Sequence, residues 1–488
     1  MKTSQIIVAA AFFAVNPASQ AESDITTPTT DFSRAEKYEL YPGGAATHRK
    51  KLNSSAFSHA SANMNFKREL NFKVGNGFFK RLWVSAPSST QAADGLGPLY
   101  SARSCQRCHL KDGRGHPPNG PDDNAVSMLL RLSIPPQNNA DRQMLADHKL
   151  NVVVEPTYGN QLQDFAIPGH QAEGRMYISY EEISLPLADG ETVKLRKPSY
   201  LIKDLGYGPL HPKTMVSPRI SPQMIGLGLL EAIDAKDILI QADPEDKDAN
   251  GISGKPNQVW SAEQNKVMLG RFGWKAGMPS INEQSQAAFA GDIGISVPLH
   301  PHGTGECTTR QKTCLSAPDG NSEQFENLEA HSKVVKLVNF YSRNLAVPAR
   351  RDMKTAEVLA GKKLFYQIGC IQCHKPKYVT RKDSIGAEQS HQLIWPYSDL
   401  LLHDMGEGLA DHRPEGEANG REWRTAPLWG IGLTPLVNGH SFYLHDGRAR
   451  NLLEAILWHG GEAEPHRNAV IKLKKIKREN LLRFVESL

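Results

Sequence analysis

Long apolar runs, a large net charge and abundant cysteine are all missing from this sequence. Its formal net charge is only +5 over 488 residues, which gives no indication of a nucleic-acid partner. Beyond the N-terminus, no stretch approaches the roughly 20 apolar residues that a transmembrane helix requires. We therefore expect no membrane span and no nucleic-acid surface. The length instead predicts roughly two to four domains with ample core.

The N-terminus has the pattern of an export signal. Lys2 supplies a positive charge, residues 6–15 form a short apolar run, and Ser19 and Ala21 place small residues at the positions of a cleavage site. We expect cleavage after Ala21, so that residues 1–21 are a signal peptide and the mature protein is periplasmic; a buried N-terminal helix is the alternative. Residues 22–50 are polar and are expected to form a loose leader.

Four of the six cysteines fall into two Cys-x-x-Cys-His motifs. The first consists of Cys105, Cys108 and His109, and the second of Cys370, Cys373 and His374. In such a motif the two thiols add to the vinyl groups of one haem, and the adjacent imidazole binds its iron. A four-cysteine zinc site would leave both histidines unexplained. The motifs therefore predict two covalently bound c-type haems, with His109 on the iron of haem 1 and His374 on that of haem 2.

The two remaining cysteines, Cys307 and Cys314, lie in a loop rich in small and polar residues. In an oxidising compartment, a disulfide that staples this loop is the plain interpretation. Free reactive thiols are the alternative.

Hydrophobic patterning predicts helices before both haem motifs, over 75–100 and 352–370, and at the C-terminus over 451–459 and 478–487. Alternating polar and apolar residues over 150–203 predict a β-rich insertion. A short repeat, Arg219-Ile-Ser-Pro222 and Arg424-Thr-Ala-Pro427, suggests duplicated halves. We expect a mainly α protein of two cytochrome c-like haem domains, 51–345 and 346–488, with the β-containing insertion in the first.

A loop of alternating oxygen-bearing residues resembles the front half of a calcium-binding loop. Its candidate ligands are Asp246, Asp248, Asn250 and the carbonyl of Ile252, and Gly251 allows a sharp turn. The twelfth position is Asn257 and not Glu, so the loop is not a complete EF-hand. A calcium site and a plain Asx-rich turn both stay open.

The stretch from Trp423 to Ala463 resembles the C-terminal signature of the bacterial di-haem cytochrome c peroxidases and the methylamine-utilisation di-haem enzymes. From about residue 53 onward, the chain is similar to the bacterial di-haem oxidoreductase family, whose members are described as peroxidases. The motifs that carry this second resemblance are Asp94-Gly-Leu-Gly-Pro98, Tyr158-Gly-Asn-Gln-Leu-Gln163, Gly270-Arg-Phe-Gly-Trp274 and His403-Asp-Met405-Gly. The classical peroxidases are shorter between their haem motifs, so the insertions are departures from them.

The resemblance implies a second ligand for haem 2. In the peroxidases the sixth ligand is a methionine fourteen residues after the histidine of the His-x-Gly motif, and here that count leads from His445 to His459. We therefore expect a bis-histidine haem held by His374 and His459. His403 and Met405 are competing ligands, and a structural histidine at a helix end is the plain alternative for His459.

The resemblance also implies catalytic residues near haem 1. Trp274 matches the tryptophan between the haems, Gln284 the glutamine that orients peroxide, and Asp292 the acid that moves a proton between the peroxide oxygens. The family has glutamate slightly beyond the position of Asp292. Core packing, a surface amide and a helix-capping acid are the respective alternatives.

Taken together, these features predict a periplasmic di-haem oxidoreductase that reduces peroxide at haem 1 with electrons from a small redox protein, relayed through haem 2. A non-catalytic electron-transfer cytochrome is one alternative, and an oxidase of a protein, thiol or metal ion is another. The sixth position of haem 1 stays open, with four residues that could reach it: His116, His170, His211 and Met215.

Overall fold

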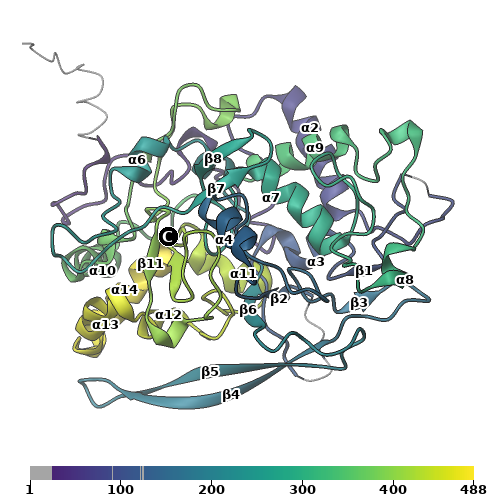
Figure 1. The fold of residues 1–488 in the computed structure, drawn as a ribbon. Coiled ribbons are helices and arrows are strands. Elements are labelled where there is room, and N and C mark those ends of the chain that lie inside the picture. Colours follow the sequence, from purple (N-terminus) through teal and green to yellow (C-terminus); the bar gives the residue numbers. More distant parts are fainter. Residues whose placement is uncertain (1–24, 91, 121–122, 124–125) are drawn as a thin grey trace, which may run out of the picture.

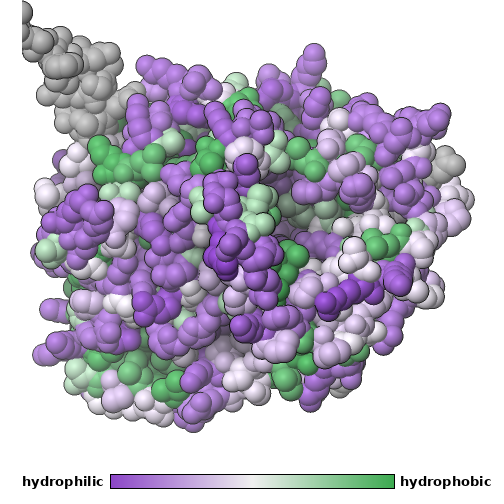
Figure 2. Space-filling view, in the orientation of Figure 1, coloured by the Kyte–Doolittle hydropathy of each residue, from purple (hydrophilic) through white to green (hydrophobic). Residues whose placement is uncertain are grey.

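The computed structural model describes residues 25–90, 92–120, 123 and 126–488. The expected signal peptide, 1–21, lies outside the described residues. Helices α10, α12, α13 and α14 gather on one side of the molecule, and α2, α7 and α9 on the other (Figure 1). The face in Figure 2 is predominantly hydrophilic, with apolar side chains in separate small patches. None of the helices in the described part of the chain has the length and apolar character that a membrane span requires.

The fold is not mainly α, so that prediction was wrong. About 30% of the chain is helical and 17% is in strands, and the strands form several two-stranded sheets. They are not confined to an insertion, because the C-terminal region also contains strand pairs. The long segments between helices bury their backbone, and pairing into short ladders is how buried N–H and C=O groups find partners.

The helices alternate with these strand pairs along the chain. The N-terminal region, up to residue 345, contains α2 (Phe66–Lys80), α3 (Cys105–Cys108), α4 (Asn139–Ala146), α5 (Leu227–Glu231), α6 (Ala235–Leu239), α7 (Ile281–Ala288), α8 (Lys312–Leu315) and α9 (Ser332–Arg343). The C-terminal region, 346–488, contains α10 (Ala356–Ile368), α11 (Thr434–Asn438), α12 (Leu452–Leu457), α13 (Glu464–Ile471) and α14 (Lys475–Ser487).

Each sheet is an antiparallel pair of strands. The pairs are β1 (Leu99–Tyr100) with β3 (Phe165–Ala166), β2 (Met128–Ser133) with β6 (Met215–Ile220), β4 (Arg175–Pro186) with β5 (Thr192–Lys203), β7 (Gln258–Ser261) with β8 (Lys266–Leu269), β9 (Tyr378–Val379) with β10 (Leu393–Ile394), and β11 (Leu402–Asp404) with β12 (Glu422–Arg424).

A pair of packed helices accompanies each Cys-x-x-Cys-His motif, and the first helix of each pair precedes the motif in sequence. In the N-terminal region α2 packs on α9, and Gly75 of α2 lies directly against the carbonyl oxygen of Leu337, where any Cβ would clash. In the C-terminal region α10 packs on α14, and Gly361 lies in the same way against the carbonyl of Asn480. A helix thus precedes each motif as expected, but the first begins at Phe66, before the expected residue 75, and ends at Lys80. The two helix pairs use the same close-packing device.

The β-rich character expected over 150–203 is confirmed by β4 and β5, which form a long hairpin along the lower edge of the molecule (Figure 1). This hairpin extends from the N-terminal region across the C-terminal region. Leu187 and Leu195 join the C-terminal core, and the hydroxyl of Tyr200 donates to Asp446 at 2.9 Å. Arg478 of α14 forms an ion pair with Asp189 in the hairpin turn at 2.9 Å. The hairpin therefore fastens the two regions together.

The described part of the expected leader is not loose. Glu36 forms ion pairs with Lys362 at 2.8 Å and Lys377 at 2.6 Å, and Glu39 pairs with Arg350 and, at 3.0 Å, with Lys362. Glu39 and Lys362 are each only 1% exposed. Buried ammonium and guanidinium groups need carboxylate partners, and this polar segment supplies them, which its composition alone did not indicate.

This network predicts a large loss of stability for Glu39→Ala. The substitution leaves Arg350 buried without its carboxylate, and breaking such a buried pair costs about 3–5 kcal/mol. Urea unfolding of the haem-loaded protein measures the change. As a control, Asp31→Ala removes an exposed pair with Arg34 and should leave the unfolding curve unchanged. Equal curves for Glu39→Ala and the wild type would show that the segment contributes nothing.

Candidate functional site

The two histidines of the Cys-x-x-Cys-His motifs are held in the same way. Nδ1–H of His109 donates to the carbonyl oxygen of Pro222, and Nδ1–H of His374 donates to that of Tyr397, both at 2.9 Å. Burial lowers the pKa of both imidazoles to about 4, so both are neutral at physiological pH. A neutral imidazole whose Nδ1 is engaged offers Nε2 to a metal. Both histidines therefore have the orientation that a metal ligand needs.

The four thiols of the motifs are all free of disulfides. Cys105 and Cys108 form the short helix α3, and Cys370 begins a 3-10 turn after the left-handed residue Gly369. Burial raises the pKa of Cys105 and of Cys370 to about 12. Adjacent thiols that remain reduced beside an oriented imidazole are the arrangement that thioether attachment of a haem needs. The residues present therefore fit a covalently bound haem at each motif.

His459 lies near His374. Its Nδ1–H donates to the carbonyl oxygen of Ala455 at 2.8 Å, so its Nε2 is the free ring nitrogen. Burial is the main cause of the low pKa of His374, and a positive charge on His459 lowers that pKa further. The two rings therefore lie within electrostatic range of each other. Both imidazoles thus have Nδ1 engaged by a main-chain carbonyl, as the two ligands of one iron would require.

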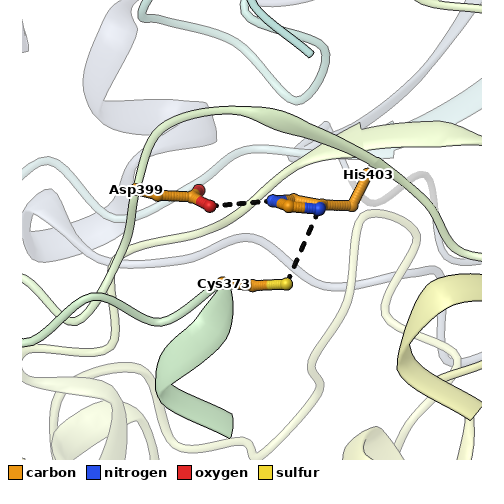
Figure 3. A group of neighbouring side chains, drawn as sticks. All are labelled: Cys373, Asp399 and His403. Carbon is orange, nitrogen blue, oxygen red and sulfur yellow. Dashed lines mark hydrogen bonds and ion pairs between the residues drawn. The ribbon is translucent and has the colours of Figure 1, made fainter. Parts of the chain in front are cut away.

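His403, the competing histidine, has no free ring nitrogen. Nδ1 lies 2.8 Å from Glu462 and Nε2 lies 2.8 Å from Asp399, and Cys373 Sγ is 3.6 Å from Nδ1 (Figure 3). Although burial lowers it, the charge of Asp399 raises the pKa of His403 well above its ordinary value. A protonated imidazole between two carboxylates is a poor iron ligand. Met405, the other competing ligand, is partly buried and packs against the hydrophobic core of the C-terminal region.

Near the first motif, the structure brings Asp292 and Gln161 together. Asp292 lies in a π-helical turn, Phe289–Ile293, that follows α7, and its carbonyl accepts from the backbone N–H groups of Ser101 and Ala102. Nε2 of Gln161 donates to the Asp292 carboxylate at 3.0 Å. Burial raises the pKa of Asp292, and its charge in turn raises the pKa of Cys105 and Cys108. This acid therefore lies close to the first haem-attachment motif.

Gln284 forms no hydrogen bond with Asp292, which follows it by more than two helical turns along the chain. It lies in α7 with its Oε1 facing Gly273, where an added Cβ would be 3.9 Å away. The amide that contacts the acid is Gln161, which the sequence analysis missed as a site residue. Its only signal was its place in the Tyr158–Gln163 motif.

Trp274 is buried where the two regions meet. Its Nε1–H donates to the carbonyl oxygen of Ile220 at 2.8 Å, two residues before Pro222, and its own carbonyl accepts from Arg424. The His445 ring lies edge-on at 6.5 Å from the Trp274 ring and stacks on Trp423 at 3.8 Å. An aromatic cluster therefore connects the strand that leads to Pro222 with the C-terminal region.

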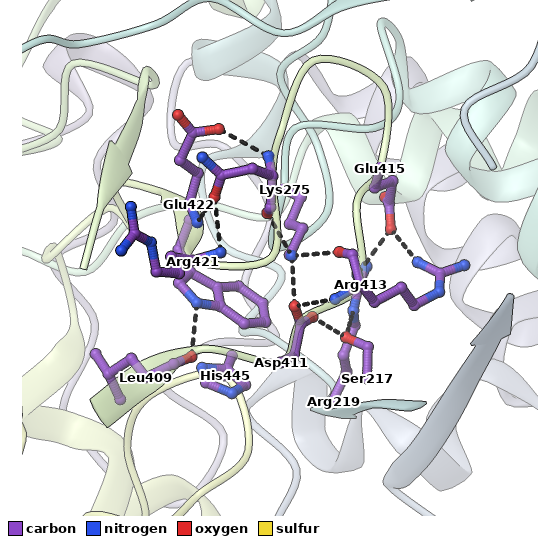
Figure 4. A network of polar contacts seen from close by, with 12 residues as sticks. Ser217, Arg219, Lys275, Leu409, Asp411, Arg413, Glu415, Arg421, Glu422 and His445 are labelled. Atoms are coloured by element: carbon purple, nitrogen blue, oxygen red, sulfur yellow. Dashed lines mark hydrogen bonds and ion pairs between the residues drawn. The ribbon is translucent and has the colours of Figure 1, made fainter. Parts of the chain in front are cut away.

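A buried ion network surrounds this cluster (Figure 4). Lys275 has no exposed surface, donates to Asp411 at 2.7 Å and lies 4.6 Å above the Trp423 ring. Glu415 accepts from Arg219 at 2.7 Å and from Arg413 at 2.8 Å. Although burial raises it, the charges of these two arginines hold the pKa of Glu415 well below its usual range. The network fixes β6 against the loop 411–419.

The acidic loop over 246–252 has its carboxylates engaged by the loop itself. Asp246 accepts from Gly251 N–H, Asp248 accepts from Asn250, and the Asn250 side chain accepts from Ile252 N–H. Ligand atoms of Asp243, Asp246 and Asp248 lie within 4.8 Å of one another. These are the contacts of an Asx-rich turn, and calcium binding stays a prediction.

Four residues were candidates for the sixth position of haem 1. His116 donates through Nδ1 to Pro117 and packs edge-on against His440 at 5.2 Å. His211 accepts from the backbone of Lys213, and Met215 begins β6. Nδ1 of His170 is buried without a partner. These contacts place none of the four against His109.

The expected disulfide between Cys307 and Cys314 is confirmed. It closes a loop that contains α8 and is anchored by a hydrogen bond from the Thr308 hydroxyl to the carbonyl of Thr157 at 2.8 Å.

Comparison with known proteins identifies the family. A family model described as "Di-haem oxidoreductase, putative peroxidase" matches residues 38–488, and no curated protein matches significantly. Among solved structures, a chain of Kuenenia stuttgartiensis hydrazine synthase pressurized with 20 bar xenon is 20% identical, with a TM-score of 0.22. The match covers 34% of this chain and spans 58% of that one, and so low a score supports no argument about fold. Because the family model includes both Cys-x-x-Cys-His motifs and nearly the whole sequence, the chain belongs to the di-haem oxidoreductase family.

Proposed function

We propose that the protein is a periplasmic c-type di-haem oxidoreductase that reduces peroxide at haem 1 with electrons relayed through haem 2. Residues 51–345 would carry haem 1 and residues 346–488 haem 2. The observation that carries the proposal is a difference between the two motifs. At the second motif His459 lies within electrostatic range of His374, and the nearby carboxylates of Asp399 and Glu462 are both engaged by His403. At the first motif burial, and then the charge of Asp292, raise the pKa of Cys105 and Cys108. One site is suited to electron transfer and the other to substrate.

The chain's own residues have distinct roles at the two sites. When bound, each haem supplies an iron that exchanges single electrons. His109 and His374 would bind the irons, and His459 would be the second protein ligand of haem 2. Asp292, whose pKa is raised by burial, can hold a proton more readily than an exposed acid and can move it between the two oxygens of peroxide. Gln161 orients Asp292 through their hydrogen bond.

Trp274 is the proposed electron path between the sites. Its hydrogen bonds to Ile220 and Arg424 hold the indole between the strand that supports His109 and the C-terminal region. The electron donor is a small periplasmic redox protein that delivers electrons at haem 2. The side-chain oxygen of Gln284 faces Gly273, the residue before Trp274. Gln284 therefore lies near Trp274 and does not orient Asp292.

Haem attachment can be counted directly. Replacing Cys105 and Cys108 with Ala should leave one covalently bound haem per chain, and so should replacing Cys370 and Cys373, because each thiol pair holds one haem. Mass spectrometry of the denatured protein gives the number of haems. A Cys307→Ser/Cys314→Ser variant is the control and should keep both. Two haems in either motif variant would contradict the assignment.

The ligand assignment at haem 2 predicts a change in potential. His459→Met should keep haem 2 low-spin and raise its midpoint potential, because a thioether ligand favours ferrous iron. Spectroelectrochemistry measures both properties. His403→Gln is the matched control and should leave the spin state unchanged, since both nitrogens of His403 are already engaged. An unaltered spectrum and potential in His459→Ala would place the ligand elsewhere, with Met405 the next candidate.

The catalytic proposal is tested by adding peroxide and following both haem spectra. In the wild type both should change without an outside donor, since haem 2 supplies the second electron. Asp292→Asn should slow the reaction by ~10²-fold or more, the usual contribution of a positioned acid–base group. Trp274→Phe should slow the change at haem 2 but not at haem 1. A wild-type rate in Asp292→Asn would refute the pocket assignment, and a wild type inert to peroxide in every redox state would refute the peroxidase function.

A further inference from the structure

We propose that Glu306 is a second proton-holding carboxyl in the haem 1 pocket, paired with Asp292, and that the Cys307–Cys314 disulfide positions it there. The inference rests on the proposed function, in which peroxide reacts beside Asp292. It adds a residue that neither the motifs nor the family resemblance indicated.

The packing around Glu306 places its carboxyl next to Asp292. A Cβ added to Gly291, the residue before Asp292, would lie 3.3 Å from Glu306 Oε1. A Cβ added to Gly159 would lie 3.1 Å from the Glu306 carbonyl oxygen and 3.6 Å from Oε2. The side chain therefore runs between two glycines, one beside Asp292 and the other two residues before Gln161. A larger residue at Gly291 would press on the carboxyl, and one at Gly159 would press on the Glu306 main chain.

Two buried acceptors at this place have no hydrogen-bond partner among the described residues, Oε2 of Glu306 and Oε1 of Gln161. The orientation of the Gln161 amide follows from its neighbours. The Ser101 hydroxyl donates to Gln163 at 2.8 Å, so it must accept from Gln161 Nε2, which also donates to Asp292. Leaving a buried acceptor unpaired costs roughly 1–3 kcal/mol. A small ligand with two O–H donors, such as hydrogen peroxide or water, would satisfy both atoms.

The charges around the pair favour a shared proton. Burial raises the pKa of both carboxyls, and Asp292 raises that of Glu306 further, while Arg131 opposes the shift at each. Two close carboxyls do not readily ionise together, so one keeps a proton at a pH where an isolated acid has lost it. The side chain of Asn160 is the other group that stabilises the charged form of Glu306.

The reaction gives this second proton a use. Reduction of one hydrogen peroxide to two waters breaks the O–O bond and consumes two electrons and two protons. The donor protein supplies the electrons. Asp292 can move a proton from one peroxide oxygen to the other, but this transfer supplies neither of the two protons that the reduction consumes. A proton held by Glu306 supplies one of the two that are consumed, and solvent then restores it.

The disulfide explains how an otherwise irregular loop keeps Glu306 in place. Cys307 follows Glu306 directly and is bonded to Cys314. Within the closed loop, the Thr308 hydroxyl donates to the carbonyl of Thr157, and Gln311 donates to the buried Glu173 at 2.5 Å. The staple thus fixes Glu306 against the segment that carries Gly159 and Gln161.

Infrared titration of the carboxyl groups in the resting, haem-loaded protein tests the pair without any turnover. The difference between the wild-type and Glu306→Gln spectra should contain a protonated-carboxyl band that persists above the pH at which an exposed acid ionises, because the substitution removes the carboxyl whose pKa burial and the charge of Asp292 raise. The pH profile of the peroxide reaction should shift to lower pH in the same variant, with a loss of about tenfold or more in rate near neutrality.

Three further variants complete the test. Glu329→Gln removes another buried carboxyl, one bonded to Ser296 and Gly320, and should leave the pH profile of the reaction at its wild-type position. Glu306→Asp should restore part of the high-pH band, and Cys307→Ser/Cys314→Ser should shift the profile toward that of Glu306→Gln. If Glu306→Gln keeps the wild-type pH profile and rate of the peroxide reaction, as Glu329→Gln should, the inference is overturned. A coupled titration in a protein that ignores peroxide would instead overturn the proposed function and leave the carboxyl pair standing.

Discussion

The hydrogen bond between an imidazole Nδ1–H and a main-chain carbonyl recurs at both haem motifs, and the rest of the site depends on it. It fixes the ring of His109 through Pro222 and that of His374 through Tyr397, and it leaves Nε2 as the atom available to iron. The carbonyls come from segments more than twenty residues away in sequence. The β2–β6 pair, the hairpin of β4 and β5 and the ion network around Lys275 all help to hold these segments in place.

The difference between the two sites follows from what lies near each oriented imidazole. His374 has His459, whose own Nδ1 is engaged in the same way. The first motif has buried carboxyl and amide groups, with Asp292 bonded to Gln161 and Glu306 beside them. A second imidazole suits an iron that only exchanges electrons, whereas a buried acid that is not held in an ion pair can exchange protons with a bound substrate. The aromatic cluster of Trp274, His445 and Trp423 lies where the two regions meet.

Part of this organisation could be predicted from the sequence, because the Cys-x-x-Cys-His spacing marks the two sites and the helices before them have a clear apolar period. The disulfide and the β-rich segment were predicted for similarly local reasons. The helix-dominated fold class was wrong, since short strand pairs carry no strong pattern. The family's spacing after Trp274 pointed to Gln284, but the amide that contacts Asp292 is Gln161, from a distant segment of the chain. The repeat built on Pro222 and Pro427 does not extend to the histidine contacts, because Tyr397 and not Pro427 holds His374, and duplicated halves stay a prediction.

The electron paramagnetic resonance spectrum of the oxidised protein tests the central claim, that one haem is open to substrate and the other is closed by two histidines. The account predicts a high-spin ferric signal from haem 1 beside a low-spin, bis-histidine signal from haem 2, in about equal amounts, and added cyanide should convert only the high-spin signal. Two low-spin signals that cyanide leaves unchanged would contradict it, because neither iron would then have a position for peroxide.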